Sequence, residues 1–173
     1  MALVSYGAYP NIMIDDPGAG FSFGDTVREA LAKIASEPKG LQLLQEIQAN
    51  APTFAPWGGS VKIYRAALLI EQGGSKAAAV QEEAAKSGIG SASGVAWNSN
   101  VFAIPGQGPR PPFVGLAHEL IHAWHNAKGT KKASYEDEEN FTVGLGAYML
   151  PTPGAITENM IRLEHGVPIR HRY

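Results

Sequence analysis

The sequence contains no cysteine among its 173 residues. This absence excludes disulfide bonds, thiolate zinc sites and cysteine nucleophiles, and it is compatible with either redox compartment. Charged residues make up only 17% of the chain, and the net charge is −2. Such a composition gives no general attraction to nucleic acid or to an anionic membrane surface, so we expect neither as a partner.

Long apolar runs are also missing. No stretch of the sequence approaches the ~20 apolar residues of a membrane span. The first residues lack the basic segment and the apolar stretch of a signal peptide, as do proteins exported by injection machines or cut from larger toxins. The length predicts a single domain over residues 1–173. Residues 1–24 are rich in Gly, Pro and Asp and are expected to form a loosely structured lead-in.

Apolar spacing predicts helices over residues 25–36 and 38–50, and alternation predicts a strand over 61–64. The Ala- and Glu-rich segment 73–88 fits a surface helix or a mobile insertion equally well. Residues 93–106 predict two short strands joined as a hairpin at 98–100. Further helices are expected over 113–128, 134–148 and 158–165, each with a residue at its start or end that favours a cap.

The most informative pattern is the run HELIHAWH at residues 118–125. His118 and His122 lie on one face of a helix, and Glu119 points about 100° away from His118. Two imidazoles at this spacing can hold one zinc ion, and the adjacent carboxylate can take a proton from the attacking water. The helix has a separate apolar face, so it does not need these histidines for packing. We predict that His118 and His122 bind Zn²⁺ and that Glu119 is the general base.

A catalytic zinc ion needs a third protein ligand. The metzincin pattern would place a histidine where the sequence has Lys128, and the aspartate pattern after the helix is only half met. The turn at 129–134 can bring the next helix back antiparallel, which leaves Glu136, Glu138 and Glu139 as candidates. Glu139 shares its helix face with small residues that permit a close approach. We therefore predict Glu139 as the third ligand, with Glu138 as the alternative.

The tetrahedral oxyanion of peptide hydrolysis needs a hydrogen-bond donor besides the metal. The residue types alone do not choose among six possible donors, which are Tyr148, His165, Arg170, His171, Arg172 and Tyr173. His125 lies about 4.5 Å along the helix axis beyond His122, so we expect it to contact a ligand residue or the substrate rather than the metal. The strand pair at 93–104 is expected to offer an edge to which an extended peptide adds.

Three blocks of the sequence together resemble a known family: HELIHAWHNAKG at 118–129, EENFTVGL at 138–145 and ITENMIRLEHGVPIRHRY at 156–173. The chain resembles the NleD-like zinc metallopeptidase effectors, which pathogenic bacteria inject through type III secretion. The resemblance covers about residues 95–173. It implies an α+β, zincin-like fold, with the active-site helix packed on a small antiparallel or mixed sheet with flanking helices. It also implies that the tail belongs to the site, so Tyr173 and Arg170 are expected to take part in catalysis.

From the motif and the resemblance we predict a gluzincin-like zinc endopeptidase that uses Zn²⁺ as its cofactor. The predicted protein is a secreted effector or toxin, delivered by a non-classical route, that cleaves proteins of a target cell. One alternative is a zinc hydrolase that acts on a non-peptide amide or ester. Another is a non-catalytic metal-binding interaction module, although the presence of Glu119 argues against it. The sequence does not identify a chaperone, carrier or immunity protein as a partner.

Overall fold

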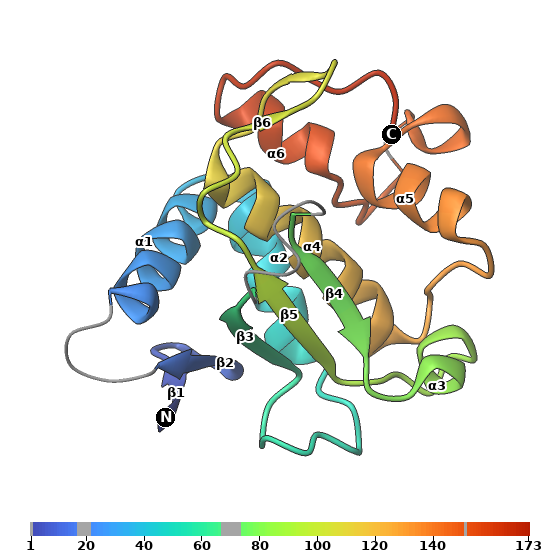
Figure 1. Ribbon diagram of the computed structural model, residues 1–173. Helices are drawn as coiled ribbons and strands as arrows, with labels where there is room; N and C mark the ends of the chain where they lie inside the picture. Colours follow the sequence, from blue (N-terminus) through green and yellow to red (C-terminus); the bar gives the residue numbers. More distant parts are fainter. Residues whose placement is uncertain (1, 17–21, 67–73, 151) are drawn as a thin grey trace.

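The computed structural model describes residues 2–16, 22–66, 74–150 and 152–173 (Figure 1). Five strands form a mixed sheet in the order β1-β2-β3-β5-β4. The strands of this sheet are β1 (Ala2–Tyr6), β2 (Tyr9–Asp16), β3 (Val61–Arg65), β4 (Lys76–Ala79) and β5 (Ser93–Trp97). The pairs β2–β3 and β3–β5 are parallel, whereas β1 and β4 run antiparallel to their neighbours. A separate two-stranded ribbon pairs β6 (Ala103–Ile104) with β7 (Gly108–Pro109).

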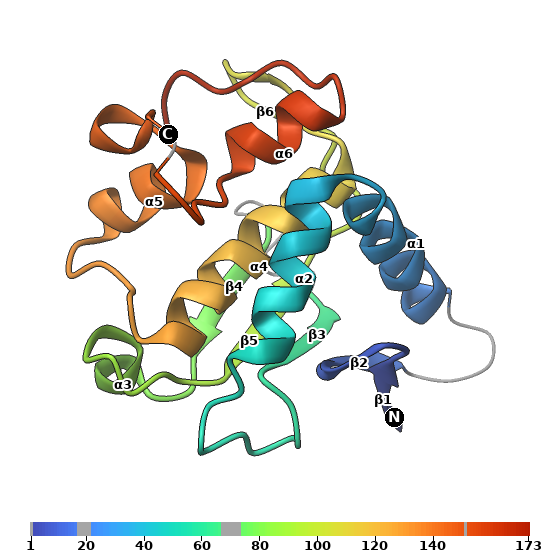
Figure 2. The same ribbon diagram turned by 180° about the vertical axis from the view of Figure 1, so that it is seen from behind.

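The helices of the described residues are α1 (Phe23–Ala35), α2 (Pro38–Ala49), α3 (Glu82–Lys86), α4 (Pro112–Lys128), α5 (Tyr135–Val143) and α6 (Glu158–Glu164), with a 3₁₀ turn, η2, at Gly146–Tyr148. Helix α4 packs against β4 and β5, while α2 packs against β2 and against α4. Figure 2 shows α2 and α4 in front of the strands, with α5 and α6 alongside α4. Within the described part of the chain, no helix is long and apolar enough to cross a membrane.

Alternating residues of the central strands form the floor of the hydrophobic core. The inward-facing side chains of β2, β3 and β5 are all buried: Ile12, Ile14, Val61, Ile63, Val95 and Trp97. Helix α1 covers them with Val27, Leu31 and Ile34, which fall on one helical stripe and are fully buried. This apolar layer fixes the position of α4, because the sheet-facing side of α4 belongs to the same core.

Two residues set the limits of α4. Pro112 stands at its first turn, where the missing N–H is not needed, and Gly129 ends it with a φ of 69°. A Cβ atom on Gly129 would lie 2.5 Å from the Cα atom of Gly88, so the backbones of the two segments touch. Glycine is therefore required at position 129 both for its left-handed conformation and for this close approach.

The structure corrects the prediction for the N-terminal region. The expected loose lead-in over 1–24 is wrong for most of its length, because residues 2–16 form the antiparallel pair β1–β2 and α1 begins at Phe23. Residues 1 and 17–21 of that range lie outside the described residues. Ile12 and Ile14 alternate with more exposed residues along β2, and this pattern is what the core requires of a strand.

The segment before α4 also differs from the prediction. The hairpin expected over 93–106 is wrong, because β5 pairs with β3 and β4 whereas β6 pairs with β7. The edge strand beside α4 is β4, not the predicted pair at 93–104. The described part of 73–88 forms strand β4 and the short helix α3. The segment is therefore neither a continuous surface helix nor an insertion. The helix predicted over 134–148 ends at Val143, since Gly144 has a φ of 85°. The predicted α+β class with a mixed sheet is confirmed.

Candidate metal centre

Helix α4 turns its polar face away from the sheet and towards α5 and α6. The four polar side chains of this face are nearly inaccessible, with exposures of 3% for His118, 5% for Glu119, 9% for His122 and 1% for His125. Helix α5 carries the acidic partners. It begins after Ser134, whose hydroxyl accepts a hydrogen bond from the backbone N–H of Asp137 at 3.2 Å, as an N-cap does.

Three donor atoms converge at the middle of this face. The Nε2 atom of His118 lies 3.1 Å from Nε2 of His122 and 3.1 Å from Oε2 of Glu139, and the His122–Glu139 separation is 3.3 Å. Ligand atoms placed tetrahedrally around Zn²⁺ lie about 3.3–3.5 Å apart, given bonds of about 2.0–2.2 Å. The donor types and their spacing therefore fit a zinc ion with little rearrangement.

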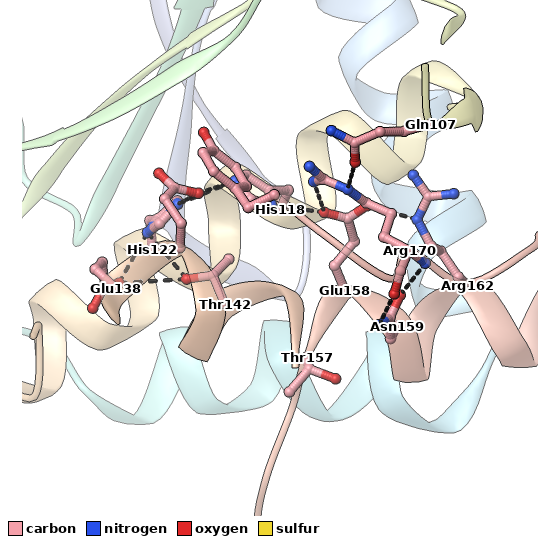
Figure 3. Close-up of polar contacts among 12 residues, drawn as sticks. Gln107, His118, His122, Glu138, Thr142, Thr157, Glu158, Asn159, Arg162 and Arg170 are labelled. Atoms are coloured by element: carbon pink, nitrogen blue, oxygen red, sulfur yellow. Dashed lines mark hydrogen bonds and ion pairs between the residues drawn. The ribbon is translucent and has the colours of Figure 1, made fainter. Parts of the chain in front are cut away.

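The opposite nitrogen of each ring is already engaged. The Nδ1 atom of His118 lies 2.8 Å from Oε2 of Glu158, and Nδ1 of His122 lies 2.9 Å from Oε1 of Glu138. Figure 3 shows His118 and His122 with these two carboxylates on either side. A carboxylate that accepts a hydrogen bond from Nδ1–H keeps the lone pair of the ring on Nε2, which is the atom that a metal needs.

A second group of possible ligands comprises His122, His125 and Glu138, whose ligand atoms lie within 4.8 Å of one another. Here Oε1 of Glu138 is 2.9 Å from Nδ1 of both histidines, and its Oε2 accepts the backbone N–H of Lys132 at 2.8 Å. These contacts occupy both carboxylate oxygens of Glu138. The group of His118, His122 and Glu139 is the better fit, because all of its members line an open cleft. His125 lies against Glu138, away from these three donor atoms.

Glu158, which holds His118, is itself fixed by two arginines. Its carboxylate is fully buried and pairs with Nε of Arg162 at 2.6 Å and with Nη1 of Arg170 at 3.0 Å. Burial raises the pKa of Glu158, but its hydrogen bond with His118 and the nearby positive charges outweigh burial and hold the pKa well below the usual range. Glu158 is thus a carboxylate throughout the physiological pH range.

The charges at the centre of the site reinforce one another. Burial opposes ionisation of Glu139, yet its hydrogen bonds with His118 and His122 lower its pKa to about 2. Burial likewise disfavours a protonated His122, but its contacts with Glu138 and Glu139 prevail and raise its pKa to about 10. Without a metal, the carboxylates hold a proton on His122. A divalent cation would take the place of that positive charge.

The metal-ligand group lies in a cleft of about 650 Å³. Helix α4 contributes His118, Glu119 and His122, and the opposite wall consists of strand β4 and the residue before it, Ser75. Tyr173 and Tyr135 also line the cleft. The cleft therefore places the candidate ligands, the predicted base and a sheet edge around one space.

The six predicted oxyanion donors have different surroundings. Tyr173 is the one among them that lines the cleft. The Tyr148 hydroxyl donates to Asp137 at 2.9 Å, and Arg172 donates to the carbonyl of Gly106 at 2.9 Å. His165 packs edge-on against Phe113, and His171 is exposed.

Arg170 is buried and acts on two neighbours. Besides its ion pair with Glu158, its guanidinium lies over the ring of Tyr173 at 5.1 Å from the ring centre, and its Nε donates to Gln107 at 2.8 Å. The Tyr173 ring in turn stacks on His118, with 6.3 Å between ring centres and 9° between planes. The tail thus belongs to the same contact network as the metal-ligand group.

Sequence reasoning missed Glu158 and Tyr135. Glu158 follows Thr157, the N-cap of α6, and stands four residues before Arg162. An acid and a base at this spacing normally form a solvated helix pair, so burial was the missing signal. Tyr135 begins α5, and its sequence context carries no sign of the contact that it makes with Tyr173.

The fold and the site define a zincin-like metallopeptidase. The structure is similar to the botulinum neurotoxin type D light chain, with a TM-score of 0.62 and 15% identity over 90% of this chain and 59% of that chain. It is also similar to the catalytic domain of Clostridium botulinum neurotoxin serotype F, with a TM-score of 0.59 and 17% identity over 89% of this chain and 58% of that one. This chain thus spans about three fifths of those proteins, and at such identities the likeness concerns the fold.

The model of the M91 peptidase family, described as an effector protein, matches residues 11–173. The chain belongs to this family, which is the NleD-like effector family that its motifs resemble. The comparison with curated proteins gives no match. The predicted class, a metallopeptidase effector, is confirmed, and the predicted cofactor, Zn²⁺, suits the histidine and glutamate donors that the chain brings together.

Proposed function

We propose that this effector is a zinc-dependent endopeptidase that hydrolyses peptide bonds in proteins of a target cell. The observation that carries the proposal is the convergence of His118, His122 and Glu139 in a cleft that Glu119 also lines. The alternative ligand set around Glu138 offers no carboxylate oxygen without an N–H partner. We therefore assign His118, His122 and Glu139 as the ligands of the zinc ion.

Zn²⁺ held by these residues would supply a Lewis acid that polarises the scissile carbonyl group and lowers the pKa of the attacking water. Glu119 is the general base in this proposal. Its carboxylate sits beside the ligands, takes the proton of the attacking water and delivers it to the leaving amine nitrogen. Proton transfer of this kind contributes about a hundredfold to ten-thousandfold to a rate.

Tyr173 is the proposed donor to the developing oxyanion. Its phenol lines the cleft, and its ring lies parallel to the imidazole of His118. Burial is the main cause that raises the pKa of Tyr173 well above its usual value of 10, so the phenol keeps its proton and can donate it in a hydrogen bond. Arg170 positions this group, because its guanidinium covers the phenol ring and its ion pair with Glu158 anchors the tail.

An extended peptide fits the cleft beside β4. This strand pairs with β5 along one side and lies at the edge of the sheet in the strand order, so its other side faces the cleft. Backbone pairing with such an edge holds a peptide without regard to most of its side chains. A small-molecule amide or ester would not use this wall, and this feature favours a protein substrate.

Effector function requires delivery into another cell, and we propose a non-classical secretion route for this chain. Proteins or peptides of the target cell are the proposed partners. The net charge of −2 supports neither a nucleic acid nor a membrane surface as an alternative partner.

Elemental analysis of the purified protein tests the metal site first. We expect one zinc ion per wild-type chain and none in His118→Ala. Glu119→Gln is the matched variant, which should retain zinc but lose at least a hundredfold in cleavage rate. The substrate is found by mapping new N-termini in a target-cell lysate treated with wild-type protein or with Glu119→Gln.

Each outcome has a definite meaning. No bound zinc after reconstitution would refute the metallopeptidase mechanism for this chain. Zinc binding with no new N-termini, but with turnover of small amides or esters, would support the non-peptide hydrolase. Zinc binding with no hydrolysis of any kind would support the binding module.

A further inference from the structure

The hydroxyl groups of Tyr135 and Tyr173 meet at the mouth of the cleft. Their oxygen atoms are 2.6 Å apart, and the two rings contact edge to face with 5.9 Å between centres and 72° between planes. Tyr135 is the first residue of α5, the helix that carries Glu138 and Glu139. Tyr173 lies 38 residues further along the chain. A contact across this separation joins the tail directly to the helix that provides a metal ligand.

Several polar contacts of the tail hold residues before Tyr173. The backbone N–H and C=O of Arg170 both bond to the side-chain amide of Asn159, at 2.8 and 2.9 Å. Arg172 is held through Gly106. These contacts fix the path of the tail, and the Arg170 guanidinium lies over the Tyr173 ring, but none of them holds the phenol oxygen of this residue, which is 49% exposed. Two groups contact the phenol oxygen, the hydroxyl of Tyr135 at 2.6 Å and the carboxylate of Glu139.

The contact matters for catalysis because it decides which hydroxyl hydrogen, that of Tyr135 or that of Tyr173, remains free to donate to another group. Two hydroxyl groups carry two hydrogens, and one of them lies in the hydrogen bond between the two oxygens. If Tyr135 donates, the hydrogen of Tyr173 is left for an acceptor in the cleft, and in this structure that acceptor is the Glu139 carboxylate. A hydroxyl that already accepts a hydrogen bond donates more strongly to the next acceptor, because chains of hydrogen bonds polarise one another.

We propose that Tyr135 is a positioning residue, which donates to the Tyr173 hydroxyl and thereby aims the remaining hydrogen of Tyr173 at the oxyanion of the substrate. This inference rests on the proposed peptidase function, in which Tyr173 is the donor. Tyr135 does not touch the reacting atoms in this arrangement. Its contribution arises only when charge develops on the substrate oxygen, so it favours the transition state over the bound substrate.

Tyr135→Phe tests the proposal, because it removes only the hydroxyl of an exposed residue. We expect kcat to fall about three- to tenfold, with KM and zinc stoichiometry unchanged. Tyr148→Phe is the matched control. The hydroxyl of Tyr148 donates to Asp137 of α5, the helix that also carries Tyr135, and loss of this hydroxyl should leave kcat unchanged. In the Tyr173→Phe background the Tyr135→Phe change should have no further effect, since its partner is already absent.

A second readout does not require activity. In protein labelled with ¹³C at tyrosine Cζ, the resonance of Tyr173, assigned through Tyr173→Phe, should shift in Tyr135→Phe but not in Tyr148→Phe. An unchanged resonance would overturn the contact. An equal loss of kcat with and without the Tyr173 hydroxyl would overturn the positioning role. If the wild-type protein hydrolyses no peptide while the resonance shifts, the contact stands and the proposed function fails.

Discussion

The two faces of α4 are buried to a similar degree, but different forces stabilise them. On the side of the sheet, Leu116 and Leu120 are fully buried in a continuous apolar core. On the other side, His118, His122 and His125 are nearly as inaccessible, yet each contacts an ionised carboxylate. Apolar burial has no preferred direction and tolerates changes of shape, whereas a buried charge depends on each partner. On the apolar face, the loss of stability caused by a mutation should therefore depend on the change in side-chain volume. On the polar face, it should depend on whether a charged partner is removed.

The largest effect on stability is expected at Glu158. Glu158→Ala leaves the buried Arg162 and Arg170 without their shared carboxylate, and removal of one partner of a buried pair costs about 3–5 kcal/mol. Urea unfolding of the metal-free protein measures this loss. Glu136→Ala, an exposed acid on α5, should change stability by less than about 0.5 kcal/mol. A loss below about 1 kcal/mol at Glu158 would show that the polar face does not depend on pairing.

The next effect concerns the apolar face. Leu120→Ala should cost about 3 kcal/mol through lost burial and the cavity left behind, while zinc stoichiometry stays at the wild-type value. Leu120→Met keeps the volume and should cost less than about 1.5 kcal/mol. Thermal unfolding with zinc analysis of the folded protein tests both. Equal losses in the two variants would contradict the idea that volume governs this face.

Zinc itself should stabilise the polar face. At free zinc of about 100 times its Kd, the unfolding free energy should rise by about 2.7 kcal/mol, and a chelator should reverse this gain. Glu138→Ala should weaken zinc binding by about ten- to a hundredfold, because it removes a partner of a ligand. Glu139→Ala should weaken binding further, since it removes a ligand. The reverse order in a zinc titration would exchange their roles.

The last expected effect is a dependence on pH, which is gradual because it extends over several pH units. The folded-state pKa of His122 is raised to about 10 from an ordinary 6.5, so in the metal-free protein its stabilising contribution is complete below pH 6.5 and is lost as the pH rises through about 10. Zinc needs the unprotonated ring. Apparent zinc affinity should thus rise with pH across this window, by up to about tenfold per unit for one released proton. A zinc titration with no pH dependence would exclude a proton on His122.

The difference between the two faces also explains which features the sequence could predict. The helix of residues 113–128 was predictable because its apolar and histidine positions each follow the helical period. Glu139 was a sound candidate because helix spacing and turn length are local. The structure places its Oε2 3.1 Å from His118 Nε2.

The errors arose where tertiary pairing decides the structure. Strand β4 consists of Lys76 and three alanines, residues with little strand preference, and it forms because β5 offers a pairing edge. The contact of Glu158 with His118 and the contact of Tyr135 with Tyr173 join residues 40 and 38 positions apart in the sequence. No periodic pattern encodes such contacts. Sequence reasoning therefore named the three donor residues that the structure brings together, but not the residues that support them.

The long separations within the polar cluster have a consequence for the order of folding. The imidazole of His118 reaches its carboxylate across 40 residues, and the guanidinium of Arg170 reaches Gln107 across 63. Contacts that close such long loops form after local helices and the collapse of the apolar layer. The contacts that support His118 and anchor the tail are thus among the last to form. A chain that is held extended, as in passage through a narrow channel, contains every catalytic side chain but no peptidase until it refolds.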